Sequence, residues 1–177
     1  MSAPSSLLLI DENQRVLAQL EGLLKRVDPK AYQRLLGAHA TQSLGKHVRH
    51  VLEHYQTLLE ACSASPLQTT LDYEQRKRET VLENDPAEAL ARVKTVQENL
   101  ASLTTTPPTT PLTLHYPVDD SAATFPTSLG RELAFLTSHT VHHMALISLL
   151  CETLDIPLPK AFGVHPSTLR YWERQAG

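Results

Sequence analysis

The chain has 177 residues, and its 16 lysines and arginines against 19 aspartates and glutamates give a formal charge of −3. This length fits a single domain, 1–177, that is large enough to bury an apolar core. A near-neutral charge without a basic tract argues against nucleic acid or an acidic membrane surface as partner. We find no apolar run of the ~18–20 residues that a membrane span needs. Two distant cysteines without a CxxC pattern are typical of a reducing compartment, so we expect a cytoplasmic protein.

Leucine and valine recur at helical spacing through most of the chain. The first helix is predicted over about 11–27, where it meets a proline that ends it. A second helix is predicted over about 43–62, with Ser43 as its N-cap. Residues 66–84 are charged and less regular, which indicates a polar connection.

A third helix is predicted to begin at Asp85, because Pro86 at the first helical position and Glu88 three residues after the cap complete a capping-box pattern. The following run, 104–111, holds three prolines and five threonines and cannot be regular helix. Residues 112–118 then alternate apolar and polar side chains, which allows a short extended segment.

A fourth helix is predicted from Ser128 to about residue 155, and a short C-terminal helix from Pro166. Trp172 in that last helix is interpreted as part of a lid that closes the core. Four long amphipathic helices with almost no strand signal predict an all-α fold, a four-helix bundle. The unequal connections indicate that at least one of them is a long crossover loop.

Six of the nine histidines lie in two short windows, 47–54 and 139–143. His47, His50 and His54 are three and four residues apart, so all three share one face of the second helix. His139 and His143 are four apart on the fourth helix, which lets two imidazoles reach one ion. Bundles build metal sites in this way, from side chains on facing helices. A single helical histidine is more often an ordinary half-buried residue, and it is the pairing of two clusters that favours a metal.

Imidazole donors suit zinc, nickel, copper or iron, whereas magnesium or calcium requires a cluster of oxygens. Three protein ligands leave a coordination position for water or substrate, which is typical of a catalytic site, since structural zinc has four protein ligands. His142 points ~100° away from its neighbour His143, so we expect it to pack or to face solvent.

Three segments carry a resemblance to a known family: GKHVRHVLEHY at 45–55, LDYEQRKR at 71–78, and GREL at 130–133 running into the histidines at 139–143. In this order they resemble the DinB-like superfamily, which includes metal-dependent enzymes of the YfiT type, over about 40–170. The resemblance implies a DinB-like four-helix bundle. It also implies a divalent metal, zinc or nickel first and iron or manganese next, bound by one histidine of the second helix and an HxxxH pair of the fourth.

Carried over to this sequence, the ligands are His50, His139 and His143. His47 and His54 share the helical face of His50 and are the alternative ligands from this helix. We predict the middle residue of the three, His50, as the ligand. Many relatives follow the last ligand with Arg-Gly-Gln, whereas Met-Ala-Leu follows it here, which bears on the activity more than on the metal.

Further residues are candidates for supporting roles. Glu132 lies two turns before His139, where it can accept a hydrogen bond from a ligand imidazole or be a solvated or capping-region carboxylate. Tyr73, Arg76 and Arg78 lie in the polar connection. Either this connection folds over the metal and an arginine binds a substrate carboxylate or phosphate, or it is a solvated charge run, and the solvated run is favoured.

Two kinds of function follow from these features. The first is a metal-dependent transferase or hydrolase for a small molecule, with a low-molecular-weight thiol as cosubstrate because some relatives use one. The second is a non-catalytic metal-binding or interaction protein, with a homodimer left open. The sequence shows no nucleophile triad, P-loop or dinucleotide motif that would anchor another chemistry.

Overall fold

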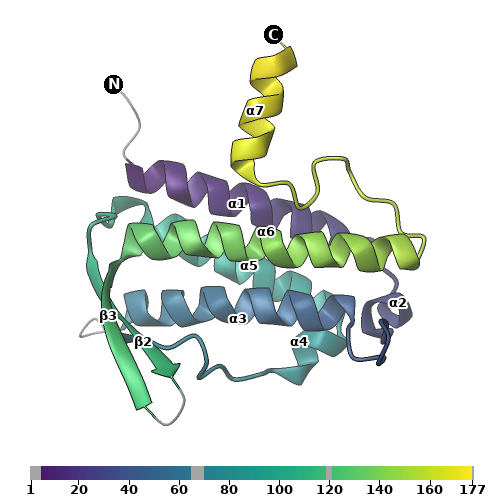
Figure 1. Cartoon of the computed structure of the whole chain (residues 1–177), viewed down its shortest axis with the longest axis horizontal. Coiled ribbons are helices and arrows are strands. Elements are labelled where there is room, and N and C mark those ends of the chain that lie inside the picture. The colour runs from purple at the N-terminus through teal and green to yellow at the C-terminus, as the bar shows by residue number, and fades with distance from the viewer. Residues whose placement is uncertain (1–4, 65–69, 119–120, 177) are drawn as a thin grey trace.

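The computed structural model describes residues 5–64, 70–118 and 121–176 (Figure 1). Most of them are helical. The helices are α1 (Ser5–Leu24), α2 (Pro29–Gln33), α3 (Leu44–Ser63), α4 (Thr80–Asn84), α5 (Pro86–Ser102), α6 (Leu129–Thr153) and α7 (Pro166–Ala176), with a 3-10 turn at Leu103–Thr105. The strands are β1 (Thr70–Leu71), β2 (Pro111–Val118) and β3 (Ser121–Ser128).

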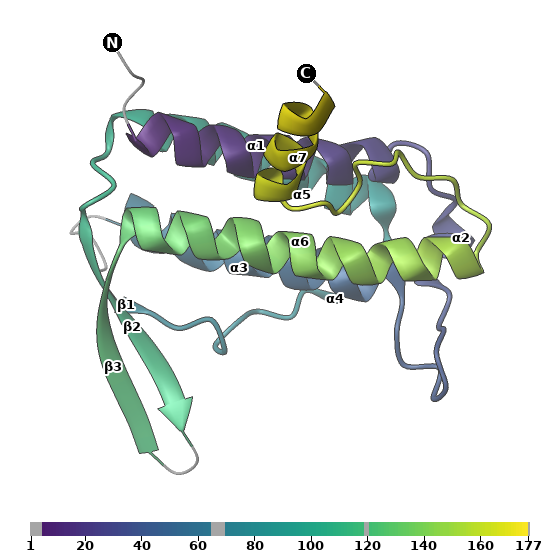
Figure 2. The same ribbon diagram turned by 45° about the horizontal axis from the view of Figure 1, so that its top comes forward.

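The long helices α1, α3, α5 and α6 run alongside one another and enclose the core (Figures 1 and 2). Helix α1 contacts α5 and α6, and α3 contacts the same two helices. Each presents an apolar stripe to the shared interior, where side chains such as Leu17, Leu58, Leu100 and Leu136 have no exposed surface. Burial of these stripes is the main stabilising contribution to a fold of this kind.

The predicted helix starts are confirmed at three caps. Ser43 Oγ accepts a hydrogen bond from the backbone N–H of Lys46, and Asp85 Oδ1 accepts from two N–H groups at the start of α5. Ser128 Oγ caps α6 in the same way. Each side chain satisfies backbone donors that the helix itself leaves unpaired. Helix α1 starts earlier than predicted, at Ser5, because the apolar residues before position 11 continue its buried side.

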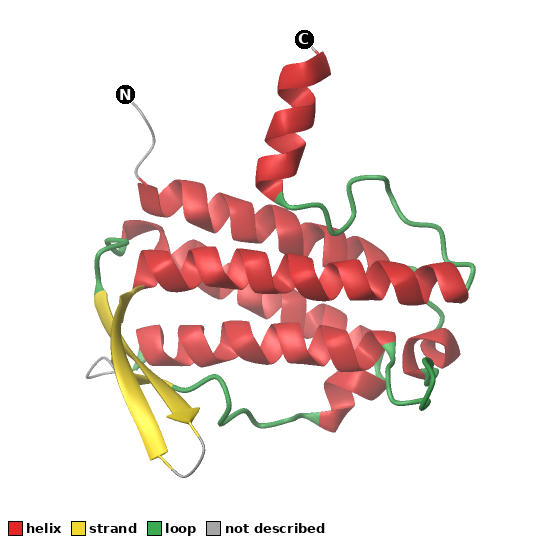
Figure 3. Cartoon of the chain, in the orientation of Figure 1, coloured by secondary structure: helices red, strands yellow, loops and turns green. Residues whose placement is uncertain are grey.

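A three-stranded sheet, in the order β1-β2-β3, corrects the all-α prediction (Figure 3). Strand β2 pairs antiparallel with β3, with Leu114 opposite Phe125, and β1 adds a short parallel pairing. The extended segment predicted over 112–118 is β2. Its partner β3 was missed because its small and polar residues carry no alternating pattern, and its extended form depends on pairing with β2. The mostly helical class is correct, and the long crossover between α5 and α6 contains this hairpin.

The interpretation of the C-terminal helix as a lid is wrong. Helix α7 has no buried residue and stands away from the long helices (Figure 1). Trp172 is 41% exposed and lies under the ammonium group of Lys160. The core is covered instead by Phe162, which is buried in the segment before α7.

Helix α6 is long and apolar enough to cross a membrane by length and composition alone, with a mean hydropathy of 1.3 over its most apolar 18-residue window. The sequence analysis had found no apolar run of this length. In this fold the apolar residues of α6 contribute to the core, where Leu133, Leu136, Met144 and Ile147 are buried.

The contact between α3 and α4 leaves no room for a side chain at Gly45. A Cβ atom there would lie 2.0 Å from the backbone oxygen of Glu83. We expect Gly45→Ala to lower the free energy of unfolding by ~1–3 kcal/mol, the usual cost of overpacking. Gly22→Ala is the matched control, because a Cβ atom at Gly22 in α1 meets nothing within 4 Å. This substitution should raise the free energy of unfolding by ~0.5–1 kcal/mol through the higher helix propensity of alanine. Urea denaturation of both variants checks the pair, and equal stabilities would contradict the close approach of α3 and α4.

Candidate metal centre

The packing of α3 against α6 brings histidines of both helices together. His50 projects from α3, and His139 and His143 project from successive turns of α6. One ring nitrogen from each lies within 4.8 Å of one from each of the others. The Nε2 atoms of His50 and His139 are 3.2 Å apart, and all three side chains are half-buried. The structure therefore places three imidazole donors around a shared centre.

The other histidines of the two windows surround this centre. His47 Nδ1 lies 3.0 Å from His143 Nδ1, so His47 contacts a ring of α6. His54 is buried, stacks on His139 with ring centroids 4.0 Å apart, and lies with its Nδ1 2.8 Å from the backbone oxygen of His50. His142 is exposed, as expected, and meets His143 only edge-on. Neither His47 nor His54 belongs to the group of three.

Burial keeps the imidazoles of His50, His54, His139 and His143 neutral. It lowers the pKa of His50 to about 2, with neighbouring imidazoles and Arg76 adding to the effect. It also lowers the pKa of His139 and of His143 to about 3, and that of His54 to about 4. Since a metal ion binds the neutral ring and competes with a proton, the donors are in their binding form at neutral pH.

The residues present fit a transition-metal ion. All three donors are imidazole nitrogens, which suit zinc, nickel, copper or iron better than the harder magnesium, calcium or manganese ions. In addition, His139 Nδ1 is buried and has no hydrogen-bond partner among the described residues. Burying a ring nitrogen without a hydrogen-bond partner costs free energy. An unpaired Nδ1 at this position therefore favours a site that binds a ligand or an ion.

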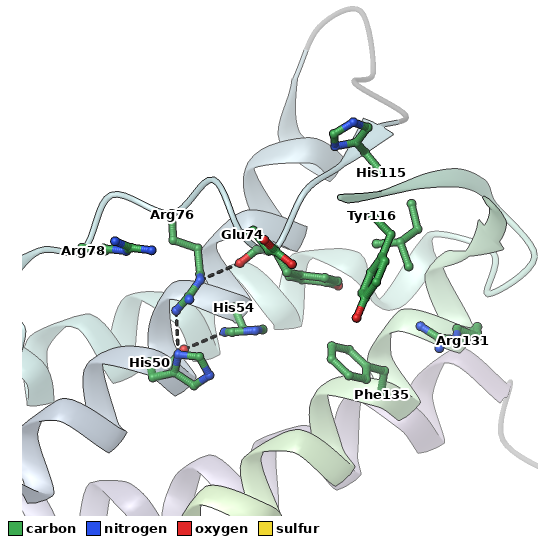
Figure 4. A pocket seen from close by; sticks show the side chains of 11 residues that line it. His50, His54, Glu74, Arg76, Arg78, His115, Tyr116, Arg131 and Phe135 are labelled. Atoms are coloured by element: carbon green, nitrogen blue, oxygen red, sulfur yellow. Dashed lines mark hydrogen bonds between the residues drawn. The ribbon is translucent and has the colours of Figure 1, made fainter. Parts of the chain in front are cut away.

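The connection between β1 and α4 folds over the histidines, so the favoured interpretation of a solvated charge run is wrong for Arg76. The Arg76 side chain is only 13% exposed. Its Nη1 donates a hydrogen bond to His50 Nδ1 at 2.6 Å, and its Nε donates to the Tyr73 carbonyl oxygen (Figure 4). Lys77, the next residue, is 65% exposed, so the two adjacent basic side chains differ sharply in burial.

Glu132 is fully buried but touches no imidazole. Its carboxylate accepts hydrogen bonds from the Tyr73 hydroxyl at 2.8 Å, from Thr127 Oγ1 and from Arg131 Nη1. Tyr73 in turn stacks on His54 at 5.2 Å between centroids. The structure therefore corrects the readings of Glu132 as an acceptor from a ligand imidazole and as a solvated group, while its place in the first turn of α6 agrees with a capping-region carboxylate. There it fixes a tyrosine that packs against the histidine cluster.

Glu53 is a residue that the sequence analysis missed. It is 3% exposed, accepts a hydrogen bond from the backbone N–H of Glu79 at 2.8 Å, and lies 3.4 Å from Arg76 Nη1. It therefore anchors the connection over the site. Its spacing of three residues from His50 places both on one helical face, and that was the available signal.

A cavity of about 500 Å³ opens beside His50 and His54 (Figure 4). Its apolar wall is formed by Tyr73, Leu114, Tyr116 and Phe135, the second and third of which come from β2. Arg76, Arg78 and Arg131 also line it. The β2–β3 hairpin, which was not predicted, thus supplies one side of the cavity, and His115 on β2 is held by a hydrogen bond between its Nδ1 and Asp72 Oδ2.

The sequence is similar to one protein family and to one known protein. The model of the DinB family matches residues 1–154. A stretch of 115 residues, 63% of the chain, is 34% identical to FK506-binding protein 5 of Rhizopus delemar, and it covers 30% of that protein. The chain thus spans less than a third of the length of this relative. No solved structure matches.

The family match covers most of the chain and includes both histidine-bearing helices, α3 and α6. On this evidence the chain belongs to the DinB family.

Proposed function

We propose that this chain is a divalent-metal-binding protein in which His50, His139 and His143 hold zinc or nickel, and that it acts as a metal-dependent transferase or hydrolase on a small molecule. The long helices α1, α3, α5 and α6 form the bundle of the DinB type in this proposal. The observation that carries it is the approach of three ring nitrogens from two helices to within 4.8 Å of one another.

The enzyme assignment rests on the cavity. Three protein ligands leave room for a further ligand on the ion, and a bound divalent ion supplies acidification of a water or thiol there. The cavity lies directly beside His50 and is large enough for a small organic molecule. Tyr73 and Phe135 give it an apolar wall. A low-molecular-weight thiol as cosubstrate and hydrolysis of an ester or amide are the two chemistries to test.

Removal of a ligand imidazole should remove the ion. Protein purified without a polyhistidine tag is expected to contain about one divalent ion per chain, measured by elemental analysis. His50→Ala and His143→Ala should each abolish this content, because two imidazoles alone bind weakly. His142→Ala is the matched control: it removes an exposed imidazole that adjoins His143, and it should retain most of the ion. Equal loss from His142→Ala would refute the ligand assignment.

Activity should depend on the metal. Thiol conjugation to small electrophiles and hydrolysis of esters and amides are to be assayed with the metal present, removed and restored. We expect turnover of substrates from one of these two classes, and we expect it only when the metal is present. Absence of turnover from both panels, in protein that carries its ion, would instead indicate the non-catalytic metal-binding alternative, and a folded protein that binds no ion would leave an interaction module.

Without metal, the stability of the fold should fall as the solution becomes acidic. A histidine of the unfolded chain titrates near 6.5, whereas burial lowers the pKa of His50, His54, His139 and His143 in the folded chain to about 2–4. Between these values the unfolded chain binds more protons, so stability is retained above about pH 6.5 and decreases below it.

Urea midpoints of the metal-free protein at pH 7.5, 6.5 and 5.5 check this expectation, because most carboxylates titrate below this window. His54→Phe removes one of the buried imidazoles and should make the dependence shallower. A midpoint that is constant from pH 7.5 to 5.5 is incompatible with four histidines whose pKa is lowered in the folded chain.

A further inference from the structure

The hydrogen bond between Arg76 and His50 fixes the position of a proton. A guanidinium group can only donate hydrogen bonds, so the Nδ1 atom of His50, 2.6 Å from Arg76 Nη1, must accept with its lone pair. The proton of the neutral His50 ring is then on Nε2, which faces His139 Nε2 at 3.2 Å. This assignment follows from the hydrogen-bond partners, as tautomers generally do.

This tautomer is incompatible with a metal ion on His50. An ion on Nδ1 would take the lone pair that Arg76 uses. An ion on Nε2 would require that nitrogen to lose its proton, and the neutral ring would then carry a proton on Nδ1. Two N–H groups would face each other at the present Arg76–His50 distance. In both cases metal binding breaks this hydrogen bond and frees Arg76 Nη1 from His50, while Nε keeps its bond to the Tyr73 carbonyl oxygen and Glu53 stays within 3.4 Å of Nη1.

Once it is free of His50, the guanidinium group of Arg76 can bind a ligand in the cavity. Arg76 lines it together with Arg78 and Arg131, and Glu74 is the one carboxylate among the residues that line it in the described part of the chain (Figure 4). Arg131 is bound to Glu132, whereas Arg78 has no hydrogen bond or ion pair among the described residues.

The backbone of Arg78 adopts a positive φ of 51°, a strained conformation for a residue other than glycine. Such strain is tolerated most often at functional sites. A second arginine, without a partner of its own, thus lines the same cavity. Two arginines beside an aromatic wall, Arg78 without a partner and Arg76 once Nη1 is freed from His50, match a small organic acid, with its carboxylate on the guanidinium groups and its apolar body on Tyr73 and Phe135.

We propose that Arg76 couples two binding events: it holds His50 in the metal-free protein and, when a metal ion takes His50, it presents its guanidinium to a small organic carboxylate in the cavity. This inference rests on the proposed metal site. By linkage, each ligand then strengthens the binding of the other by the same factor.

The first test measures zinc affinity by competition with a chelator. Arg76→Met removes the competing hydrogen bond and is expected to bind zinc about tenfold more tightly than the wild type. Arg78→Met is the matched control, because it removes the same charge from the same cavity but no bond to a histidine, and we expect it to stay within about threefold of the wild type. Equal affinities for the two variants, or weaker binding by Arg76→Met, would overturn the proposal.

The wild-type protein gives a second measurement that does not depend on the folding of Arg76→Met, which leaves buried Glu53 with one partner fewer. Imidazole ¹⁵N NMR of the metal-free protein should show the proton of His50 on Nε2. A proton on Nδ1 contradicts the proposal directly.

The second test uses benzoate as the probe and benzyl alcohol as its neutral counterpart, measured by calorimetry. Zinc should strengthen benzoate binding to the wild type more than to Arg76→Met, while benzyl alcohol should show no such difference. Because direct contact of benzoate with zinc is common to both proteins, the difference between them isolates Arg76. An equal gain in both overturns the coupling. Failure of both proteins to bind zinc would instead refute the proposed metal site.

Discussion

The organisation of this protein depends on the packing of α3 against α6, which forces imidazoles from both helices into one half-buried space. Charged rings at these distances would repel one another in a poorly hydrated environment, so burial keeps them neutral. A neutral imidazole has a lone pair on one ring nitrogen, and a transition-metal ion binds this form of the ring.

Around this centre the chain uses buried carboxylates to fix its less regular parts. Glu53 holds the backbone of the connection that carries Arg76, and Glu132 holds the hydroxyl of Tyr73. Each carboxylate is almost fully buried and is compensated by hydrogen bonds and an arginine, as a buried charge has to be. Through these contacts the connection and the β2–β3 hairpin form a cavity beside the histidines, which the helices alone would not enclose.

The sequence predicted what depends on local spacing. Helix starts at Ser43, Asp85 and Ser128 follow from side chains that cap the nearest backbone groups, and the approach of His50 to the α6 pair follows from helical periodicity together with a family resemblance. The predictions from the sequence failed where local structure depends on contacts with residues far away in the chain. Strand β3 is extended because β2 pairs with it, and no pattern within 121–128 shows this.

The same reason explains the errors at the site. Arg76 and Glu53 look like solvated charges in a linear sequence, and their burial depends on the path of the connection over α3. The lid interpretation of Trp172 failed because apolar character alone does not decide whether a helix packs on the core.

The most direct measurement for the central claim is an anomalous-diffraction crystal structure of the protein loaded with zinc. The account predicts one strong peak between α3 and α6, with one nitrogen of His50, of His139 and of His143 each about 2.0–2.1 Å from the ion. A peak held by other side chains, or no peak between these helices in crystals that contain zinc, would contradict it.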